Sequence, residues 1–180
     1  MARKHWKINK NGEELIITVS GDDNGGTITE FEGADVPGIG PPEHIHFLQE
    51  EKIRMVKGSI MVKTPDGTME LKEGEEHVFP PGVPHQFWNN GTEPNRYAGY
   101  LKPSCNWEYI IEHVYLSANA AGDVRPSPFD AAYLMTKYRT EIDLLVIPRP
   151  VKYIVFPILY VIGSLTGKFE KFGKAPSPFR

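Results

Sequence analysis

The amino-acid sequence predicts a mainly β N-terminal part followed by a helical C-terminal part. Between residues 7 and 102, short runs rich in β-branched and aromatic residues alternate with turns that contain Gly, Asn or Pro, which is the pattern of β-strands. From Pro103 onward the apolar residues recur about every three and a half positions, which is a helical spacing. We therefore expect a β-domain at residues 1–102 and a helical extension at residues 103–180 that packs on or beside it.

The expected strands follow one another closely. Residues 7–32 contain two or three strands, with the β-branched run 15–19 at their centre, and a Gly/Pro-rich loop follows at residues 33–42. Gly58 and the Glu73-Gly74 pair mark later turns. Further strands are expected at residues 51–57, 59–64, 69–71, 77–79 and 96–101.

Two helices are expected in the extension. The first has one apolar face made of Trp107, Ile110, Ile111 and Val114, and it ends at Gly122. Ser127 has the properties of an N-cap because Pro128 follows it in the first turn and Asp130 stands three residues after it. This signal predicts a second helix at residues 128–142.

Composition and charge limit the class of protein. The net charge of −3 and the lack of a basic stripe interleaved with aromatic residues give no reason to expect nucleic-acid binding. A single cysteine, Cys105, fits a reducing compartment. Basic residues, including Arg3 and Lys4, interrupt the N-terminus, so we expect no export signal and a cytoplasmic protein.

The residues that bear chemistry begin with two histidines. His44 and His46 lie two positions apart, a spacing that places both imidazoles on the same face of an extended strand. A helix would point them in different directions. Two adjacent imidazoles supply half of a site for a first-row divalent metal.

The next ligand candidate must be chosen between Glu50 and Glu51. If a strand resumes here, Glu51 shares one face with the apolar residues Ile53 and Met55, while Glu50 falls on the charged face. Glu51 therefore points inward. Because it stands an odd number of residues after His46, the chain between them must contain a bend or a bulge.

The fourth candidate is His85. It follows the run 80–84, in which three prolines and a glycine restrict the backbone. Beyond this run His85 and Phe87 alternate with polar Gln86, which places the imidazole on the same inward face as an aromatic ring.

Both regions resemble the two motifs of the cupin superfamily. The first motif is matched by Gly38, His44, His46, Glu51 and Gly58. The second is matched by Gly74, Pro80, Gly82, His85 and Asn89, and the 15 residues between the motifs suit a small cupin. The resemblance covers about residues 7–102 and implies a mainly β fold, the cupin double-stranded β-helix or jelly-roll-like barrel, here with C-terminal α-helices. Helical tails of this kind also resemble those of many small single-domain bacterial cupins.

The same resemblance implies that His44, His46, Glu51 and His85 hold one divalent transition metal, with Fe, Mn, Ni, Cu, Co and Zn all open. Three imidazoles and one carboxylate leave two positions of an octahedron free. These positions suit a chelating substrate with O2, as in the quercetin dioxygenases and germin-like oxidases that this site resembles, or Lewis-acid chemistry, and the ligand set does not choose between them. We expect a dioxygenase-like oxidoreductase that acts on a small organic molecule, in which Glu51 also moves a proton. The alternative is a non-catalytic module that binds a small ligand. A metal-free isomerising or sugar-modifying cupin ranks lower because all four ligands are present.

The substrate pocket is predicted less sharply than the metal site. Phe47, Met55, His77 and Phe87 are the candidates for its walls. His77 shares its strand face with Phe79, so it either orients a substrate or is a hydrogen-bonded histidine of the core or rim.

The C-terminal tail is the least expected segment. Residues 153–167 carry no charge, whereas residues 149–180 as a whole carry six basic residues and one acidic residue, a net charge of +5. The uncharged run is shorter than a membrane span. We expect it to pack across the barrel or between the protomers of a homodimer, and the alternative is contact with an anionic membrane surface.

Overall fold

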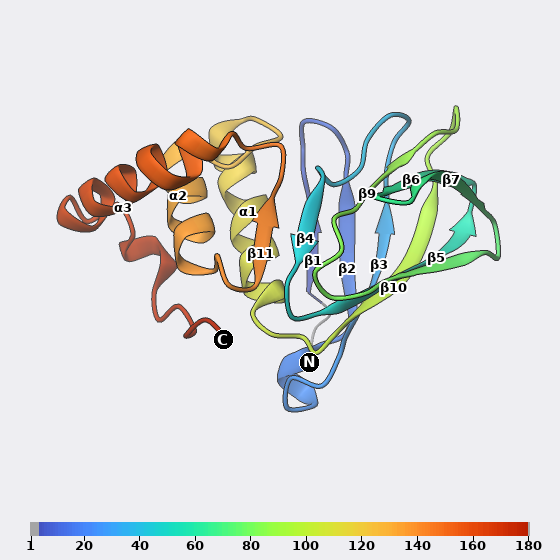
Figure 1. Cartoon of the computed structure of the whole chain (residues 1–180), viewed down its shortest axis with the longest axis horizontal. Coiled ribbons are helices and arrows are strands. Elements are labelled where there is room, and N and C mark those ends of the chain that lie inside the picture. Colours follow the sequence, from blue (N-terminus) through green and yellow to red (C-terminus); the bar gives the residue numbers. More distant parts are fainter. Residues whose placement is uncertain (1–3, 180) are drawn as a thin grey trace.

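The computed structural model describes residues 4–179 and contains two parts (Figure 1). The first is a β-barrel in which a six-stranded sheet faces a wall of two smaller sheets, and the second is a helical part attached to one side of it. The expectation of a mainly β, jelly-roll-like barrel followed by C-terminal helices is confirmed. The two parts are not cleanly separated at residue 102, since one strand of the barrel comes from the extension.

The larger sheet is antiparallel and has six strands. Its order is β1–β2–β3–β10–β5–β8, so strands from both ends of the barrel sequence meet at its centre. A short 3₁₀ turn, Gly21–Asp23, separates β2 from β3. The strands are β1 (His5–Lys7), β2 (Glu14–Val19), β3 (Thr29–Ala34), β10 (Arg96–Lys102), β5 (Glu50–Lys57) and β8 (Glu76–Phe79).

The opposite wall consists of a three-stranded sheet and a two-stranded sheet. The order β7–β6–β9 defines the first, and β11 pairs with β4 in the second. An isolated bridge between His44 and His85 joins them. The strands are β7 (Gly67–Lys72), β6 (Ser59–Thr64), β9 (Gln86–Asn89), β4 (His44–His46) and β11 (Ile142–Leu144).

Alternation along the strands builds the barrel core, because successive side chains point to opposite faces. On β5, Ile53 and Met55 are buried, whereas Arg54 between them is exposed. On β6, Ile60 and Val62 are fully buried in the same cluster. These four residues belong to the barrel core.

Two helices pack beside the barrel. Helix α1 (Trp107–Ala121) lies against the barrel and ends at Gly122, whose φ of 64° closes the helix as predicted. Helix α2 (Pro128–Lys137) begins at the predicted cap, where the Ser127 side chain accepts a hydrogen bond from the Asp130 amide. The expected end at residue 142 is wrong. The chain turns at residues 138–141 because Ile142 pairs with His46 as part of β11 instead.

Glu141 holds this turn in place. Its carboxylate is fully buried and accepts hydrogen bonds from the Asn106 amide (2.9 Å), the Asn106 side chain (2.7 Å) and the Phe179 amide (2.9 Å). The Glu141 carbonyl also accepts a bond from the Phe47 amide. One residue therefore joins the start of α1, the C-terminal tail and the barrel beside β4.

Replacement of Glu141 with alanine is expected to lower the free energy of unfolding by about 3 kcal/mol, because it leaves several buried donors without an acceptor. Urea titration followed by circular dichroism measures this change. Glu73→Ala, at an exposed turn, is the control and should change stability by less than about 0.5 kcal/mol. Equal stability of the two variants would contradict the role of Glu141.

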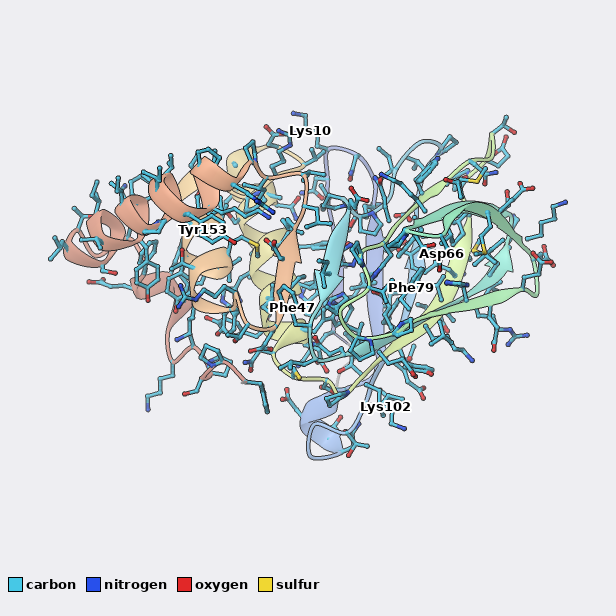
Figure 2. All side chains as sticks on the ribbon, in the orientation of Figure 1. Lys10, Phe47, Asp66, Phe79, Lys102 and Tyr153 are labelled. Carbon is cyan, nitrogen blue, oxygen red and sulfur yellow. The ribbon has the colours of Figure 1, made fainter. Side chains whose placement is uncertain are left out.

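The tail forms a π-helical turn (η2, Val151–Val155), helix α3 (Phe156–Leu165) and a short 3₁₀ turn (η3, Glu170–Phe172). It packs against α2 and lies at the end of the molecule away from the barrel (Figure 1). Figure 2 labels Tyr153 in this helical part and Asp66 in the barrel. Within residues 4–179, no helix has both the length and the apolar character required to cross a bilayer.

Candidate metal centre

The first two candidate ligands lie on β4. His44 and His46 are both buried, as the spacing of two residues on a strand predicts. Strand β11 pairs with β4 on one side, with Leu144 opposite His44 and Ile142 opposite His46. On the other side His44 and His85 exchange two backbone hydrogen bonds of 2.9 Å each. The imidazole pair is therefore held by neighbouring backbone on both sides.

The side chain of Glu51 points into the barrel. Strand β5 begins at Glu50 after an irregular segment at residues 47–49, which supplies the predicted bend. Glu51 is buried in the same row as Ile53 and Met55, whereas Glu50 accepts a hydrogen bond from the Tyr100 hydroxyl at 2.7 Å. The prediction that Glu51 points inward is confirmed.

A turn brings His85 beside the other two histidines. The Gly82 amide donates a hydrogen bond of 2.7 Å to the carbonyl of His46, which fixes the turn against β4. Gly82 has a φ of 79°, a conformation that side-chain-bearing residues rarely adopt. The glycine of this motif therefore permits the backbone contact that places His85.

The four candidate ligands converge on one point. The Nε2 atoms of His44, His46 and His85 lie 3.6, 3.3 and 2.9 Å from Oε2 of Glu51. One ligand atom from each of the four residues lies within 4.8 Å of the others. Ligands on opposite sides of one ion are about 4.2 Å apart, twice the usual metal–nitrogen distance. Small side-chain shifts are enough for all four to reach one ion.

Backbone carbonyls orient two of the three rings. Nδ1 of His44 lies 2.8 Å from the Pro42 carbonyl, and Nδ1 of His85 lies 2.9 Å from the Val83 carbonyl. A carbonyl can only accept, so both Nδ1 atoms carry a proton, and the Nε2 atoms point at the centre, where they can bind an ion once they carry no proton of their own. Nδ1 of His46 is buried and has no partner among the described residues.

The electrostatics favour the metal-binding forms of His46 and Glu51, but not that of His85. Burial lowers the pKa of His46 to about 4, which keeps its ring neutral at pH 7. Burial alone would raise the pKa of Glu51, but hydrogen bonds from the three imidazoles hold it well below its usual range. For His85, burial is outweighed by the bond to Glu51, and its pKa is raised. A proton and a metal cation therefore compete for Nε2 of His85.

A cavity of about 150 Å³ lies beside this cluster, with His44, His46 and Glu51 on its wall. A cavity of this volume accepts a single aromatic ring. The rest of the lining is mainly apolar. It includes Leu15, Phe31 and Phe87 from the barrel and Trp107, Ile110 and Val114 from α1.

The predicted pocket residues divide into two groups. Phe87 lines the cavity, whereas Phe47, Met55 and His77 do not. Met55 is buried in the barrel core, and His77 is half-buried with its ring centre 4.8 Å from that of Phe79. Phe47 is exposed and lines a separate surface hollow beside α2, because the irregular segment after His46 turns it outward.

Several polar residues in and beside the cavity were not expected from the sequence. The Tyr115 hydroxyl donates a hydrogen bond of 2.6 Å to Glu13, and both residues line the cavity together with Tyr97. Burial raises the pKa of Glu13 despite that bond. Asp35 is buried nearby. Its pKa is raised to about 8 by burial and by the charge of Glu13, which the Tyr97 hydroxyl offsets only in part.

These residues carry no recognisable motif. Glu13 directly precedes β2, and Tyr115 lies on a helix that the sequence placed outside the barrel. The one available signal was the helical spacing of Trp107, Ile110, Ile111 and Val114, which identified an apolar face. That face forms a wall of the cavity.

The fold and the cluster define a small β-barrel protein with a candidate divalent-metal centre. Residues 34–99 match the family model described as a cupin domain, which spans the four candidate ligands. This part of the chain is therefore a cupin domain. A search of curated proteins gave no match.

Solved structures similar to part of this chain include an isomerase and a cyclase. One is a sugar phosphate isomerase of the cupin superfamily from Silicibacter pomeroyi, with 17% identity, a TM-score of 0.48, and coverage of 56% of this chain and 71% of that chain. Another is a polyketide cyclase from Streptomyces resistomycificus, with 23% identity, a TM-score of 0.47, and coverage of 56% and 74%.

Proposed function

We propose that the protein is a metal-dependent enzyme, most closely of the dioxygenase type, that acts on a small apolar organic molecule inside the barrel. The observation that carries this proposal is the convergence of three imidazole nitrogens and one carboxylate, of which His44, His46 and Glu51 also line an apolar cavity. A buried cluster of this composition suits a cation, since the Nε2 atoms of all three imidazoles face one carboxylate oxygen.

The donor set fits a first-row divalent ion. Neutral imidazoles suit Fe, Ni, Cu, Co and Zn, and a carboxylate extends the range to Mn. His44, His46, Glu51 and His85 would hold the ion. When bound, such an ion supplies sites for a chelating substrate and for O2, or Lewis-acid activation of a carbonyl or of water.

The protein's own residues contribute three functions in this proposal. The apolar walls from the barrel and α1 exclude water and select an apolar substrate. Glu51 accepts or returns a proton at its carboxylate oxygen. Glu13 and Tyr115 form a second donor and acceptor pair that can bind a polar group of the substrate.

Metal content and oxygen uptake test the proposal. We expect the purified protein to contain close to one divalent transition-metal ion per chain. Samples loaded with Fe(II), Mn(II) or Ni(II) are then tested for oxygen consumption with phenols, diketones and hydroxy acids. At least one combination should consume oxygen, and the Glu51→Gln variant should not. A ligand that binds without turnover under all three metals would instead establish the non-catalytic module.

A further inference from the structure

The outer side of the tail carries an unusually exposed apolar surface. Tyr153 is 72% exposed, Ile158 54%, Val161 56% and Leu165 83%. On α3 the last three recur at spacings of three and four residues, so they form one continuous stripe. We call this surface the α3 face and define it as Tyr153, Ile154, Ile158, Val161, Ile162 and Leu165.

The opposite side of the same helix is fully used in packing. Phe156 and Gly163 are buried, and the Tyr160 ring stacks on Tyr133 of α2 with ring centres 5.8 Å apart. Gly163 has no side chain, and a Cβ there would lie 2.2 Å from the Phe169 ring. The buried side of α3 therefore holds the helix against α2. The α3 face points away from these contacts, and its side chains stay exposed in the described chain.

Basic residues flank the α3 face, and none of its members is charged. Arg149 precedes it, and Lys168 and Lys174 follow it, all three exposed. Two further lysines are paired, Lys152 with Asp143 at 2.7 Å and Lys171 with Asp130. Glu170 is the single acidic residue among residues 149–179. The surface therefore combines an apolar stripe with positive charge at both ends.

This charge arrangement argues against a second copy of the chain as the partner. In a parallel pairing of two α3 helices, Arg149 would approach the same residue of the copy. In an antiparallel pairing it would approach Lys168. Both arrangements bring like charges together, whereas an anionic lipid surface attracts both ends and accepts the apolar stripe between them.

The length of the helix fixes how it can meet a lipid surface. With 10 residues, α3 is about 15 Å long, half the thickness of the hydrocarbon core. It can lie along the interface with its apolar side buried just below the headgroups, as short amphipathic helices do. Tyr153, with an apolar ring and a polar tip, suits this boundary.

We propose that the α3 face docks the protein on an anionic lipid surface, with the helix parallel to the membrane plane. Arg149, Lys168 and Lys174 contact the headgroups, and the six apolar side chains enter the interface. The inference is independent of the metal chemistry, since no residue of the candidate metal centre takes part.

Sedimentation of the full chain with lipid vesicles tests this inference. We expect binding to vesicles of phosphatidylcholine mixed with phosphatidylglycerol, weaker binding to phosphatidylcholine alone, and weaker binding as salt is raised. The double variant Ile158→Gln, Leu165→Gln should lose at least about ten-fold in affinity. Removing the charges in Arg149→Gln, Lys168→Gln should cost about ten-fold with anionic vesicles only.

The matched control is the double variant Val56→Gln, Leu116→Gln, which removes two exposed apolar side chains from other elements and should bind as the wild type does. Light scattering without lipid reports the oligomeric state of each sample. The inference is overturned if the wild type does not bind vesicles that contain phosphatidylglycerol. It is also overturned if Ile158→Gln, Leu165→Gln binds them with the affinity of the wild type. A third outcome is also decisive against the inference. If the wild type is a dimer, does not bind vesicles, and is dissociated by Ile158→Gln, Leu165→Gln, the α3 face is an interface between two copies of the chain.

Discussion

Replacement of His46 with alanine is expected to weaken the binding of Zn(II) by at least about 100-fold. Loss of groups that merely support metal ligands costs ten- to 100-fold, so loss of a ligand costs at least as much. His46 is the most informative position because Nδ1 of its ring bonds to nothing in the described chain. The change therefore removes the Nε2 ligand atom without breaking a hydrogen bond at Nδ1. Competition with a chromophoric chelator measures the affinity.

His77→Ala is the matched control for this experiment. It removes a half-buried imidazole from β8, which pairs with the strand that carries Glu51, but lies outside the cluster of four. The affinity of His77→Ala for Zn(II) should stay within about three-fold of the wild type. This change is smaller than the loss expected when a group that supports a metal ligand is removed. If His46→Ala binds the ion as tightly as His77→Ala does, the cluster is not the metal site.

Replacement of Asp35 with asparagine is expected to make stability much less dependent on pH. Both carboxylate oxygens are buried without a hydrogen-bond partner in the described chain, and the folded pKa is about 8 against 3.8 for an ordinary aspartate. The folded state therefore binds a proton that the unfolded state has released. Stability falls as pH rises between these values, by roughly 4 kcal/mol from about pH 5 to pH 8.

Urea titration across this pH range measures the effect. At pH 8 the asparagine variant should be more stable than the wild type, because it carries no charge that must be buried or neutralised. At about pH 5 the two should differ little. The control Asp66→Asn, at an exposed turn, should follow the wild type. If the free energy of unfolding depends on pH with the same slope in all three proteins, Asp35 does not bind the proton.

The sequence predicted the barrel and the cluster well because both rest on strict periodicity. The inward direction of Glu51 follows from its parity with Ile53 and Met55, and the common face of His44 and His46 follows from their spacing. The glycines and prolines before His85 restrict the turn enough to place that ring. These constraints are local, so a single sequence contains them.

The cavity and strand β11 depend instead on contacts between distant segments. Residues 138–144 have no pattern that separates a helix end from a strand, and the bonds of Glu141 to Asn106 and Phe179 decide the outcome. The pair Glu13 and Tyr115 meets only because α1 lies along the barrel. No spacing in the sequence encodes these contacts, so the sequence alone does not show that Phe47, Met55 and His77 lie outside the cavity wall.

The pairing of β4 with β11 means that the C-terminal extension supports the strand that carries His44 and His46. A protein shortened to residues 1–102 would leave β4 as an open sheet edge that carries two imidazoles, and such edges recruit strands from other molecules. The extension therefore protects this edge from such pairing. The ion pair of Lys152 with Asp143 also links the start of the C-terminal tail to β11, in which Asp143 stands opposite Ile45 of β4.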